Sequence, residues 1–263
     1  MKRSCISSGW LRSLAFSNIS IGGKSICQDL DFELSQGQRW GVLGGNGVGK
    51  TTLLKYLAGL LPLEQGELRI DGKPLIAWSR KALARELGVL FQDSQDTFPT
   101  TVMETALSGR HPYLPFWSFE GVTEFAIAGQ ALADVAMTGM EGQQINTLSG
   151  GERRRLAIAT MIVQNPRIWL LDEPTNHLDL HHQISLLELI IGKVTTVQGA
   201  ILMVLHDVNL VSRFCTHAML MIDPQTIIRG LIQDVVTRTN LERLYRHPIQ
   251  QIQGNGMDYF FPE

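Results

Sequence analysis

Nine consecutive residues near the start of the chain have the composition of a loop that binds phosphate groups. They fit the pattern G-x-x-x-x-G-K-T and are Gly44, Gly45, Asn46, Gly47, Val48, Gly49, Lys50, Thr51 and Thr52. Glycines let successive backbone N–H groups turn towards an anion, and a following helix adds the partial positive charge of its N-terminus. We expect Lys50 to reach the β- and γ-phosphates of a nucleotide and the Thr51 hydroxyl to hold Mg²⁺.

The sequence on either side of this loop supports that interpretation. The apolar run 40–43 precedes it, and leucines follow it at the three- and four-residue spacing of a helix. The alternative is a glycine-rich turn that contains a lysine by accident. A strand before the loop and a helix after it are the context that phosphate binding requires.

A second chemical element is a pair of carboxylates at the end of an apolar run. Residues 168–171 lead directly into Asp172 and Glu173. A magnesium nucleotide needs an acid near the metal, and an attacking water needs an acceptor for its proton. We predict that Asp172 acts on Mg²⁺ and Glu173 on the water, although two acids at a strand end can also simply meet solvent.

Four apolar runs separated by helical segments predict an α/β fold built on a mainly parallel sheet with helices on both faces. The runs are residues 42–43, 89–91, 168–171 and 201–205. Ligands of such sheets bind beyond the carboxyl ends of the strands. The residues that follow the four runs should therefore face one crevice: Gly44, Gln92, Asp172 and His206.

The rest of the chain predicts smaller elements around that sheet. The N-terminal part should be antiparallel, with a hairpin over 14–35 that turns at Gly22-Gly23-Lys24 and a strand over 66–73 that enters an Asp-Gly turn. Helical patterns cover 79–86, 100–108, 122–135 and about 150–164. Beyond residue 224 we expect a short strand, a helix around 241–245 and a final extended piece.

Composition restricts the classes of function. The chain has 263 residues, 44% of them hydrophobic, and a formal net charge of −2, which provides no basic field for nucleic acid. The basic run Arg153-Arg154-Arg155 is expected to be a solvated helix face. Three cysteines without metal-like spacing suit a reducing compartment. No secretory signal or run of eighteen apolar residues is evident, so we expect a soluble chain that reaches membranes through another protein or a surface contact.

The pentapeptide at 148–152, Leu-Ser-Gly-Gly-Glu, opens a second helix and offers a second potential phosphate acceptor. An ordinary serine-capped helix is the plainer interpretation. The pentapeptide, the phosphate loop, Gln92, the acidic strand, residues 176–179 and His206 nevertheless stand in the order and spacing of the ATP-binding subunits of ABC transporters. The chain resembles that family over nearly its whole length.

This resemblance implies a P-loop NTPase-type fold and a head-to-tail homodimer that encloses two ATP molecules. Each ATP would lie between residues 44–52 of one copy and Ser149, Gly150 and Gly151 of the other. Glu173 would be the general base, or would only orient the water; His206 would contact the γ-phosphate, Gln92 the metal and water, and Asp179 the dimer interface. The chain would be one ABC-type ATPase domain over 1–263, with a core and β subdomain over about 1–92 and 161–263 and a helical subdomain over about 93–160.

Residues 100–113 and 174–179 resemble importers of iron-siderophore complexes, haem and cobalamin. The implied partners are ATP with Mg²⁺, a membrane permease and, indirectly, an extracytoplasmic binding protein; no nucleic acid is implied. The implied location is the cytoplasmic face of the inner membrane, where the chain would be bound peripherally.

The alternative is a soluble ABC ATPase that acts on ribosomes or DNA. Those proteins usually have two fused nucleotide domains or a coiled-coil arm, and neither follows in the roughly 90 residues after Glu173. A P-loop nucleoside kinase would not explain 148–152 or His206, and the catalytic positions argue against a binding-only subunit.

Three further segments leave alternatives open. The aromatic cluster from Tyr113 to Phe119 is either a docking surface for a permease helix or the small core of the helical subdomain. Ile21 stands where the family usually has an aromatic residue that stacks on adenine, so another ring such as Phe16 could hold the base. His177 and His181 are four residues apart, but lone histidine spacing is a weak indication of a metal site.

Overall fold

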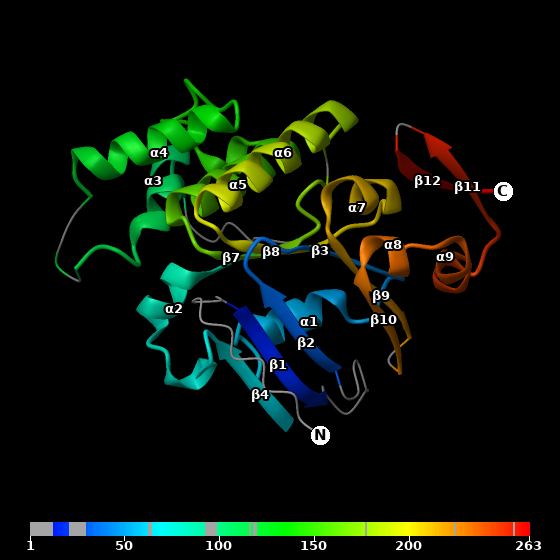
Figure 1. The fold of residues 1–263 in the computed structure, drawn as a ribbon. Helices are drawn as coiled ribbons and strands as arrows, with labels where there is room; N and C mark the ends of the chain where they lie inside the picture. Colours follow the sequence, from blue (N-terminus) through cyan, green and yellow to red (C-terminus); the bar gives the residue numbers. More distant parts are fainter. Residues whose placement is uncertain are drawn as a thin grey trace.

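The chain folds around a six-stranded sheet, seen in the computed structural model of Figure 1. The structure describes residues 13–20, 30–62, 65–92, 99–115, 117, 120–176, 178–223, 225–254 and 256–263. In the order in which they lie side by side, the strands are β10 (Thr226–Leu231), β9 (His217–Asp223), β3 (Arg39–Gly44), β8 (Ala200–Val204), β7 (Ile168–Asp172) and β6 (Leu87–Leu90). Only β10 pairs antiparallel. The predicted parallel sheet is therefore confirmed, whereas β9, an apolar run that ends in no motif, was not predicted.

Alternate side chains of the central strands enter two hydrophobic cores, one on each face of the sheet. In β7, Ile168 and Leu170 pack on the face that α1 (Lys50–Leu57) covers, and Trp169 and Leu171 pack on the opposite face. The second face is covered by α5 (Gly150–Gln164), α6 (Leu180–Thr196) and α7 (Val208–Phe214). A strand buried on both faces needs apolar residues at every position, which explains the continuous runs in the sequence.

A four-stranded antiparallel sheet lies against the α1 side of the molecule. Its strands lie in the order β2 (Leu30–Ser35), β1 (Ser13–Ser20), β4 (Gln65–Ile70) and β5 (Lys73–Pro74). The antiparallel N-terminal part is confirmed, and so is the Asp-Gly turn, where Asp71 and Gly72 have φ angles of 50° and 74°. The predicted turn at 22–24 lies outside the described residues. A 3₁₀ turn (Leu75–Ala77) and α2 (Arg80–Glu86) follow β5.

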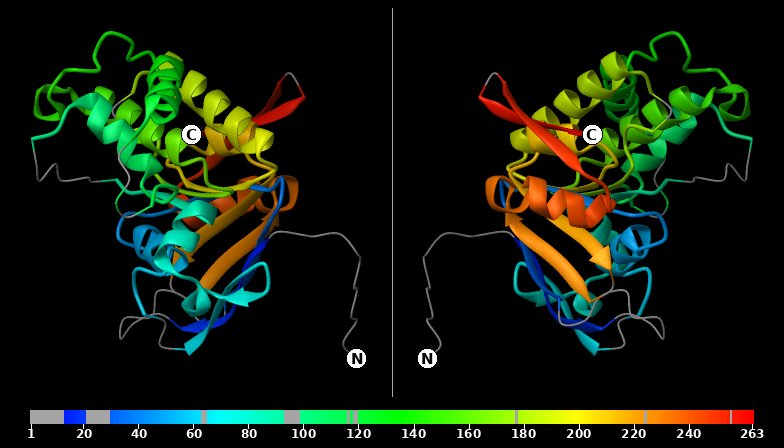
Figure 2. Two further views of the ribbon diagram at one scale, coloured as in Figure 1. Left: turned by 90° about the vertical axis from the view of Figure 1, so that its left-hand side faces the viewer. Right: turned by 90° about the vertical axis from the view of Figure 1, so that its right-hand side faces the viewer.

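The helices between β6 and β7 gather on the side of the molecule away from the antiparallel sheet, as Figure 2 shows. They are α3 (Val102–Leu107), α4 (Val122–Asp134) and α5, with 3₁₀ turns at Ser108–Arg110 and Ile145–Thr147. Thr101 precedes α3 and forms a capping box with Glu104. The Thr101 hydroxyl accepts from the Glu104 N–H and the Glu104 carboxylate accepts from the Thr101 N–H, so two backbone N–H groups at the helix start are satisfied. All three helices match the predicted segments.

The C-terminal segment ends in a hairpin where the sequence predicted only an extended piece. After α8 (Ile232–Val235) and α9 (Arg238–Tyr245), strands β11 (Ile249–Gly254) and β12 (Met257–Pro262) pair antiparallel. The hairpin is fixed to α7 because Asn209 donates to the Phe260 carbonyl at 3.0 Å and accepts from its N–H at 2.9 Å. Among the helices in the described ranges, none has the length and apolar character needed to cross a bilayer.

Candidate functional site

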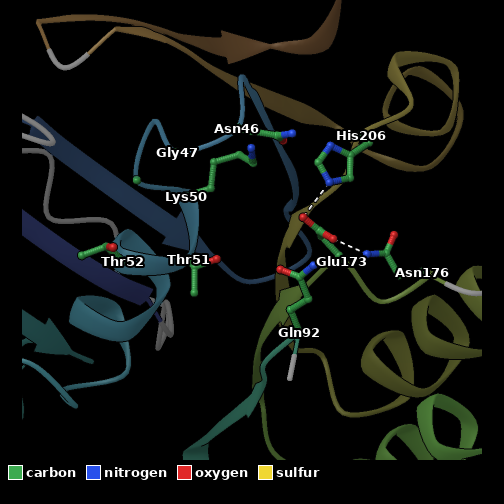
Figure 3. A pocket seen from close by; sticks show the side chains of 10 residues that line it. Asn46, Gly47, Lys50, Thr51, Thr52, Gln92, Glu173, Asn176 and His206 are labelled. Carbon is green, nitrogen blue, oxygen red and sulfur yellow. Dashed lines mark hydrogen bonds and ion pairs between the residues drawn. The ribbon is translucent and has the colours of Figure 1, made fainter. Parts of the chain in front are cut away.

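Segments that follow four strands of the sheet line one cavity of 570 Å³ (Figure 3). The strands are β3, β6, β7 and β8, so the crevice lies at their carboxyl ends as expected for a mainly parallel sheet. Its lining residues are Asn46, Gly47, Gly49, Lys50, Thr51, Thr52, Gln92, Glu173, Asn176 and His206. Among these, Asn176 is the contributor whose side chain the sequence analysis assigned no role.

The loop at 44–49 turns into α1 through backbone that only glycine adopts easily. Gly47 and Gly49 have φ angles of 75° and 107°, in the left-handed region. No side chain caps the first turn of α1, so its N–H groups are left to face the cavity. Backbone donors at an uncapped helix N-terminus are suited to an anion.

Lys50 holds a positive charge at the floor of this loop. It is 7% exposed, and its ammonium donates to the carbonyls of Gly44 and Gly45 at 2.8 and 3.0 Å. Burial lowers the pKa of Lys50, while the nearby carboxylates of Glu173 and Asp172 oppose that shift. The same two acids thus stabilise the cation and compensate its charge.

Asp172 ends β7 beneath the cavity and is fully buried. The Thr51 hydroxyl donates to its Oδ2 atom at 2.6 Å, whereas Oδ1 has no hydrogen-bond partner among the described residues. Burial raises the pKa of Asp172, more than the bond from Thr51 lowers it. A buried carboxylate oxygen without a partner is costly, which indicates that a cation or a donor can be received there.

Glu173 presents its carboxylate between two side chains at the cavity wall. The ring Nε2 of His206 lies 2.6 Å from Oε1, and the Asn176 amide donates to Oε2. Glu173 is 8% exposed, and its backbone has a φ of 51°, a left-handed conformation that is uncommon for a residue with a side chain. Gln92 lines the same cavity from the end of β6 with its side chain exposed.

The residues at 149–151 lie outside this cavity. Ser149 caps α5, accepts from the Glu152 N–H at 3.3 Å and donates its hydroxyl to the Glu152 carboxylate at 2.7 Å. These bonds lower the pKa of Glu152. Asp179 caps α6 through the His182 N–H at 2.9 Å and is exposed. A single chain therefore assembles the phosphate loop with the acids and leaves Ser149, Gly150, Gly151 and Asp179 elsewhere on its surface.

The prediction that the basic run 153–155 is a solvated face is wrong for its middle member. Arg154 is 8% exposed and donates to main-chain carbonyls at the ends of β6 and β7, including that of Phe91 at 2.7 Å. It lies on the side of α5 that faces the sheet, which it shares with the buried side chains of Ile158 and Met161 at helical spacing. Helix phase alone separates Arg154 from its exposed neighbour Arg153.

The aromatic segment divides into an inward and an outward part. Tyr113 is half-buried, donates to the Gln164 carbonyl at 2.9 Å and stacks under Arg110 at 4.2 Å, as a packed residue does. Trp117 is 89% exposed and so is not part of a core. Phe116, Phe119, Ile21 and His177 lie outside the described residues, as does the side chain of Phe16. Within the described residues, no group of three metal-binding side chains is present.

Comparison with known sequences identifies relatives of this chain. A sequence profile of the ABC transporter family matches residues 27–176. The ferric enterobactin transport ATP-binding protein FepC of Escherichia coli (strain K12) is 32% identical over 228 residues, which cover 86% of this chain and 84% of FepC. The petrobactin import ATP-binding protein FpuD of Bacillus anthracis is 34% identical over 232 residues, covering 88% and 85%. The hemin import ATP-binding protein HmuV of Escherichia coli O157:H7 is 34% identical over 232 residues, covering 86% and 88%.

Comparison with solved structures gives the same result for the fold. A structure described as an inward-facing metal-chelate type ABC transporter superposes with a TM-score of 0.81 at 27% identity, covering 96% of this chain and 97% of that one. An ATP-binding cassette in its ADP conformation superposes with a TM-score of 0.75 at 20% identity, covering 89% and 98%. The relatives named above are transport and import subunits, which favours transport over the alternative of a soluble ATPase that acts on ribosomes or DNA.

Proposed function

The chain belongs to the ABC transporter family as an ATP-hydrolysing subunit. From that premise we propose which residues bind ATP, which residues act in its hydrolysis, and what the transporter carries. The observation that carries the proposal is that the lysine loop and the Glu173–His206 pair line the same cavity. That cavity has donors for a triphosphate on one wall and an acceptor for a water proton on the other.

The phosphate-binding wall consists of residues 44–52. Backbone N–H groups of the loop and the first turn of α1 bind the phosphate oxygens, and Lys50 exchanges its carbonyl partners for the β- and γ-phosphates. Oxygen donors that suit Mg²⁺ lie beside it, namely the Thr51 hydroxyl, the unpartnered Oδ1 of Asp172 and the Gln92 amide oxygen. When bound with ATP, Mg²⁺ neutralises charge on the β- and γ-phosphates.

The hydrolytic wall consists of Glu173 and the two side chains that orient it. Glu173 accepts the proton of a water aligned with the γ-phosphate, or orients that water, from a carboxylate that His206 and Asn176 hold in one position. His206 also contacts the γ-phosphate as it arrives, and Gln92 contacts the water and metal from the end of the neighbouring strand β6. Catalysis is then alignment and charge stabilisation, as for phosphoryl transfer in general.

The remaining groups come from a second copy. Ser149, Gly150 and Gly151 lie outside the cavity of their own chain at the start of a 15-residue helix, where they can cover the ATP of a partner arranged head to tail. Asp179 lies at this same interface. The subdivision into a core with β subdomain (about 1–92 and 161–263) and a helical subdomain (about 93–160) provides the two faces that close on ATP.

The cargo we propose is an iron-siderophore complex, haem or cobalamin, carried inwards. The names of FepC, FpuD and HmuV mention ferric enterobactin, petrobactin and hemin, respectively. The chain would act peripherally at the cytoplasmic face of the inner membrane, on permease subunits that receive cargo from an extracytoplasmic binding protein. Cargo selection would reside in those partners.

Glu173→Gln tests the two-copy mechanism. We expect hydrolysis to fall by about 10²–10⁴-fold, the typical contribution of a general base, while ATP-bound dimers accumulate on size-exclusion chromatography. The matched control is Glu188→Gln on the exposed face of α6, whose ion pair with Arg213 at 3.3 Å contributes little. Monomers that hydrolyse ATP at the wild-type rate would refute the proposal.

Trp117→Ala tests the permease surface. Trp117 is 89% exposed beside a segment that α2 binds, since Arg85 donates to the Pro112 carbonyl at 2.8 Å. Exposed tryptophans are common anchors of interfaces, so binding to the cognate permease in detergent should weaken about 10-fold or more with ATPase activity of the isolated subunit unchanged. Ile252→Ala, on the distant C-terminal hairpin and 55% exposed, is the control. Equal permease affinity of all three proteins would exclude Trp117 as an anchor.

A further inference from the structure

Arg154 is a buried cation that the catalytic cavity does not contain. Its side chain is 8% exposed and lies between α5 and the sheet. The guanidinium donates to four main-chain carbonyls, those of Phe91 at 2.7 Å, Pro174 at 3.3 Å, Asp172 and Glu173. These carbonyls belong to two segments that are adjacent only in the folded chain, namely the residue after β6 and the end of β7 with the loop that follows it.

The four bonds join the two loops that carry catalytic side chains. Phe91 immediately precedes Gln92, and the other three acceptors surround the Glu173 backbone. A guanidinium presents five N–H donors in a rigid plane, so it can fix several carbonyls at once in a way that a lysine ammonium cannot. A buried charge is tolerated only when it is paired or hydrogen-bonded, and these carbonyls satisfy that requirement.

The backbone of Glu173 is held in a conformation that it would not keep alone. Its φ of 51° is left-handed, which costs energy for any residue with a Cβ and persists only where surrounding contacts determine it. The Glu173 N–H donates to the Val204 carbonyl at 3.1 Å, and its own carbonyl accepts from Arg154. These two bonds fix both peptide groups that flank the residue and so direct its carboxylate towards His206.

Arg154 lies on α5, close to the N-terminus of that helix. Arg154 is five residues after Ser149, which corresponds to about 7–8 Å along a helix with a rise of 1.5 Å per residue. The capping box between Ser149 and Glu152 stabilises this first turn, so the turn and the guanidinium move as one body. A shift of residues 149–151 therefore displaces the donor that holds the Glu173 and Phe91 carbonyls.

We propose that Arg154 is a positioning residue that links the start of α5 to the hydrolytic residues of its own copy. The inference rests on the proposed two-copy function. When residues 149–151 close on the ATP of the partner, Arg154 aligns the Glu173 carboxylate and Gln92 in the copy that owns the helix. Each copy then hydrolyses its ATP only after its α5 has contacted the ATP of its partner, so hydrolysis at the two sites is coupled.

Kinetics of Arg154→Lys and Arg154→Gln test this link. We expect kcat for ATP to fall about 100-fold, the loss typical of an ångström-scale misplacement, with KM and the ATP affinity of the monomer within about twofold of wild type. Arg155→Lys is the matched control, because Arg155 lies on the same helix and donates to the Ala136 carbonyl at 3.1 Å, away from the catalytic loops. Its kcat should equal that of wild type.

A double-mutant cycle with Ser149→Ala separates linkage from simple stabilisation. If Arg154 transmits the engagement of Ser149, the double variant Ser149→Ala with Arg154→Lys is about as slow as the slower single variant. Two independent effects would instead multiply, as we expect for Ser149→Ala combined with Arg155→Lys. Multiplication in the Arg154 cycle would overturn the inference.

Two further outcomes are informative. Loss of cooperative thermal unfolding in both Arg154 variants would mean that the residue only stabilises the fold, which also overturns the inference. A wild-type protein that neither dimerises with ATP nor hydrolyses it would refute the proposed function itself. A wild-type protein that does both, with independent effects in the Arg154 cycle, leaves the proposed function intact and removes only the link.

Discussion

Two helix N-termini with glycine and serine or threonine around them behave differently in this fold. The first turn of α1 follows two left-handed glycines and has no side-chain cap, whereas the first turn of α5 is capped by Ser149 and Glu152. The first residue of α1 is a buried lysine, and two buried acids lie nearby. The start of α5 is exposed, and its nearest carboxylate, Glu152, is engaged in capping the helix.

This difference teaches how one phosphate site can be divided between two surfaces. The α1 terminus leaves its backbone donors unused by side chains and surrounds them with the groups that a triphosphate requires. The capping box of the α5 terminus satisfies two of its backbone donors, those of Ser149 and Glu152, so the turn is stable without a ligand and can approach one as a preformed surface. In the proposed dimer, the first terminus binds the anion strongly and the second only covers it.

The largest expected effect is at the α1 terminus. Lys50→Ala removes the buried cation and should reduce ATP hydrolysis by at least about 10²–10³-fold, the loss seen when one electrostatic contact to the reacting group is deleted. ATP affinity measured by equilibrium dialysis should fall as well. Lys55→Ala, an exposed position at the end of the same helix, is the control and should retain activity.

Mixing two inactive variants tests whether both termini serve one ATP. Gly151→Asp adds a carboxylate to the start of α5, where the helix tolerates it and a triphosphate does not. Lys50→Ala and Gly151→Asp should each fail to form ATP-bound dimers on size-exclusion chromatography, but an equal mixture should form them, because half of randomly formed dimers contain one intact site. A mixture that forms no more ATP-bound dimers than its components would show that each copy depends on its own residues 149–151.

The smallest expected effect is an opposite pH dependence of stability at the two termini. Burial raises the pKa of Asp172 above its ordinary 3.8. At a pH between 3.8 and the raised pKa, the native state holds a proton that the unfolded state releases, so the native state gains stability as pH falls. This gain is lost as pH rises through the raised pKa. Bonds from Ser149 lower the pKa of Glu152 below its ordinary 4.5, so its contribution is present above 4.5 and is lost as pH falls below it.

Urea unfolding midpoints of nucleotide-free protein between pH 7 and pH 4 would measure this contrast. Relative to Asp172→Asn, the wild type should gain stability as pH falls. Relative to Glu152→Gln, it should lose stability over the lower part of the same range. Parallel trends for the two pairs would mean that the carboxylates have similar environments, contrary to the comparison of the two termini.

Much of the fold was predictable because the physical signals are local. Continuous apolar runs identified four parallel strands, and helical spacing identified α3, α4 and α5. The loop at 44–52 could be assigned from composition, since glycine, lysine and threonine are needed there for conformation, charge and metal oxygen. The hairpin β11–β12 was not predicted as a pair, because its cross-strand contacts and its bond to Asn209 are nonlocal.

The sequence by itself determined which residues could bind phosphate and accept a proton, because those properties belong to side-chain chemistry and to short spacings along the chain. Only the tertiary structure decided that Arg154 of the basic run is buried against four carbonyls and that Asn176 and His206 hold the Glu173 carboxylate. It also decided that residues 149–151 lie outside the cavity of their own chain. These facts depend on helix phase and on contacts between strand ends far apart in sequence, which no local pattern encodes.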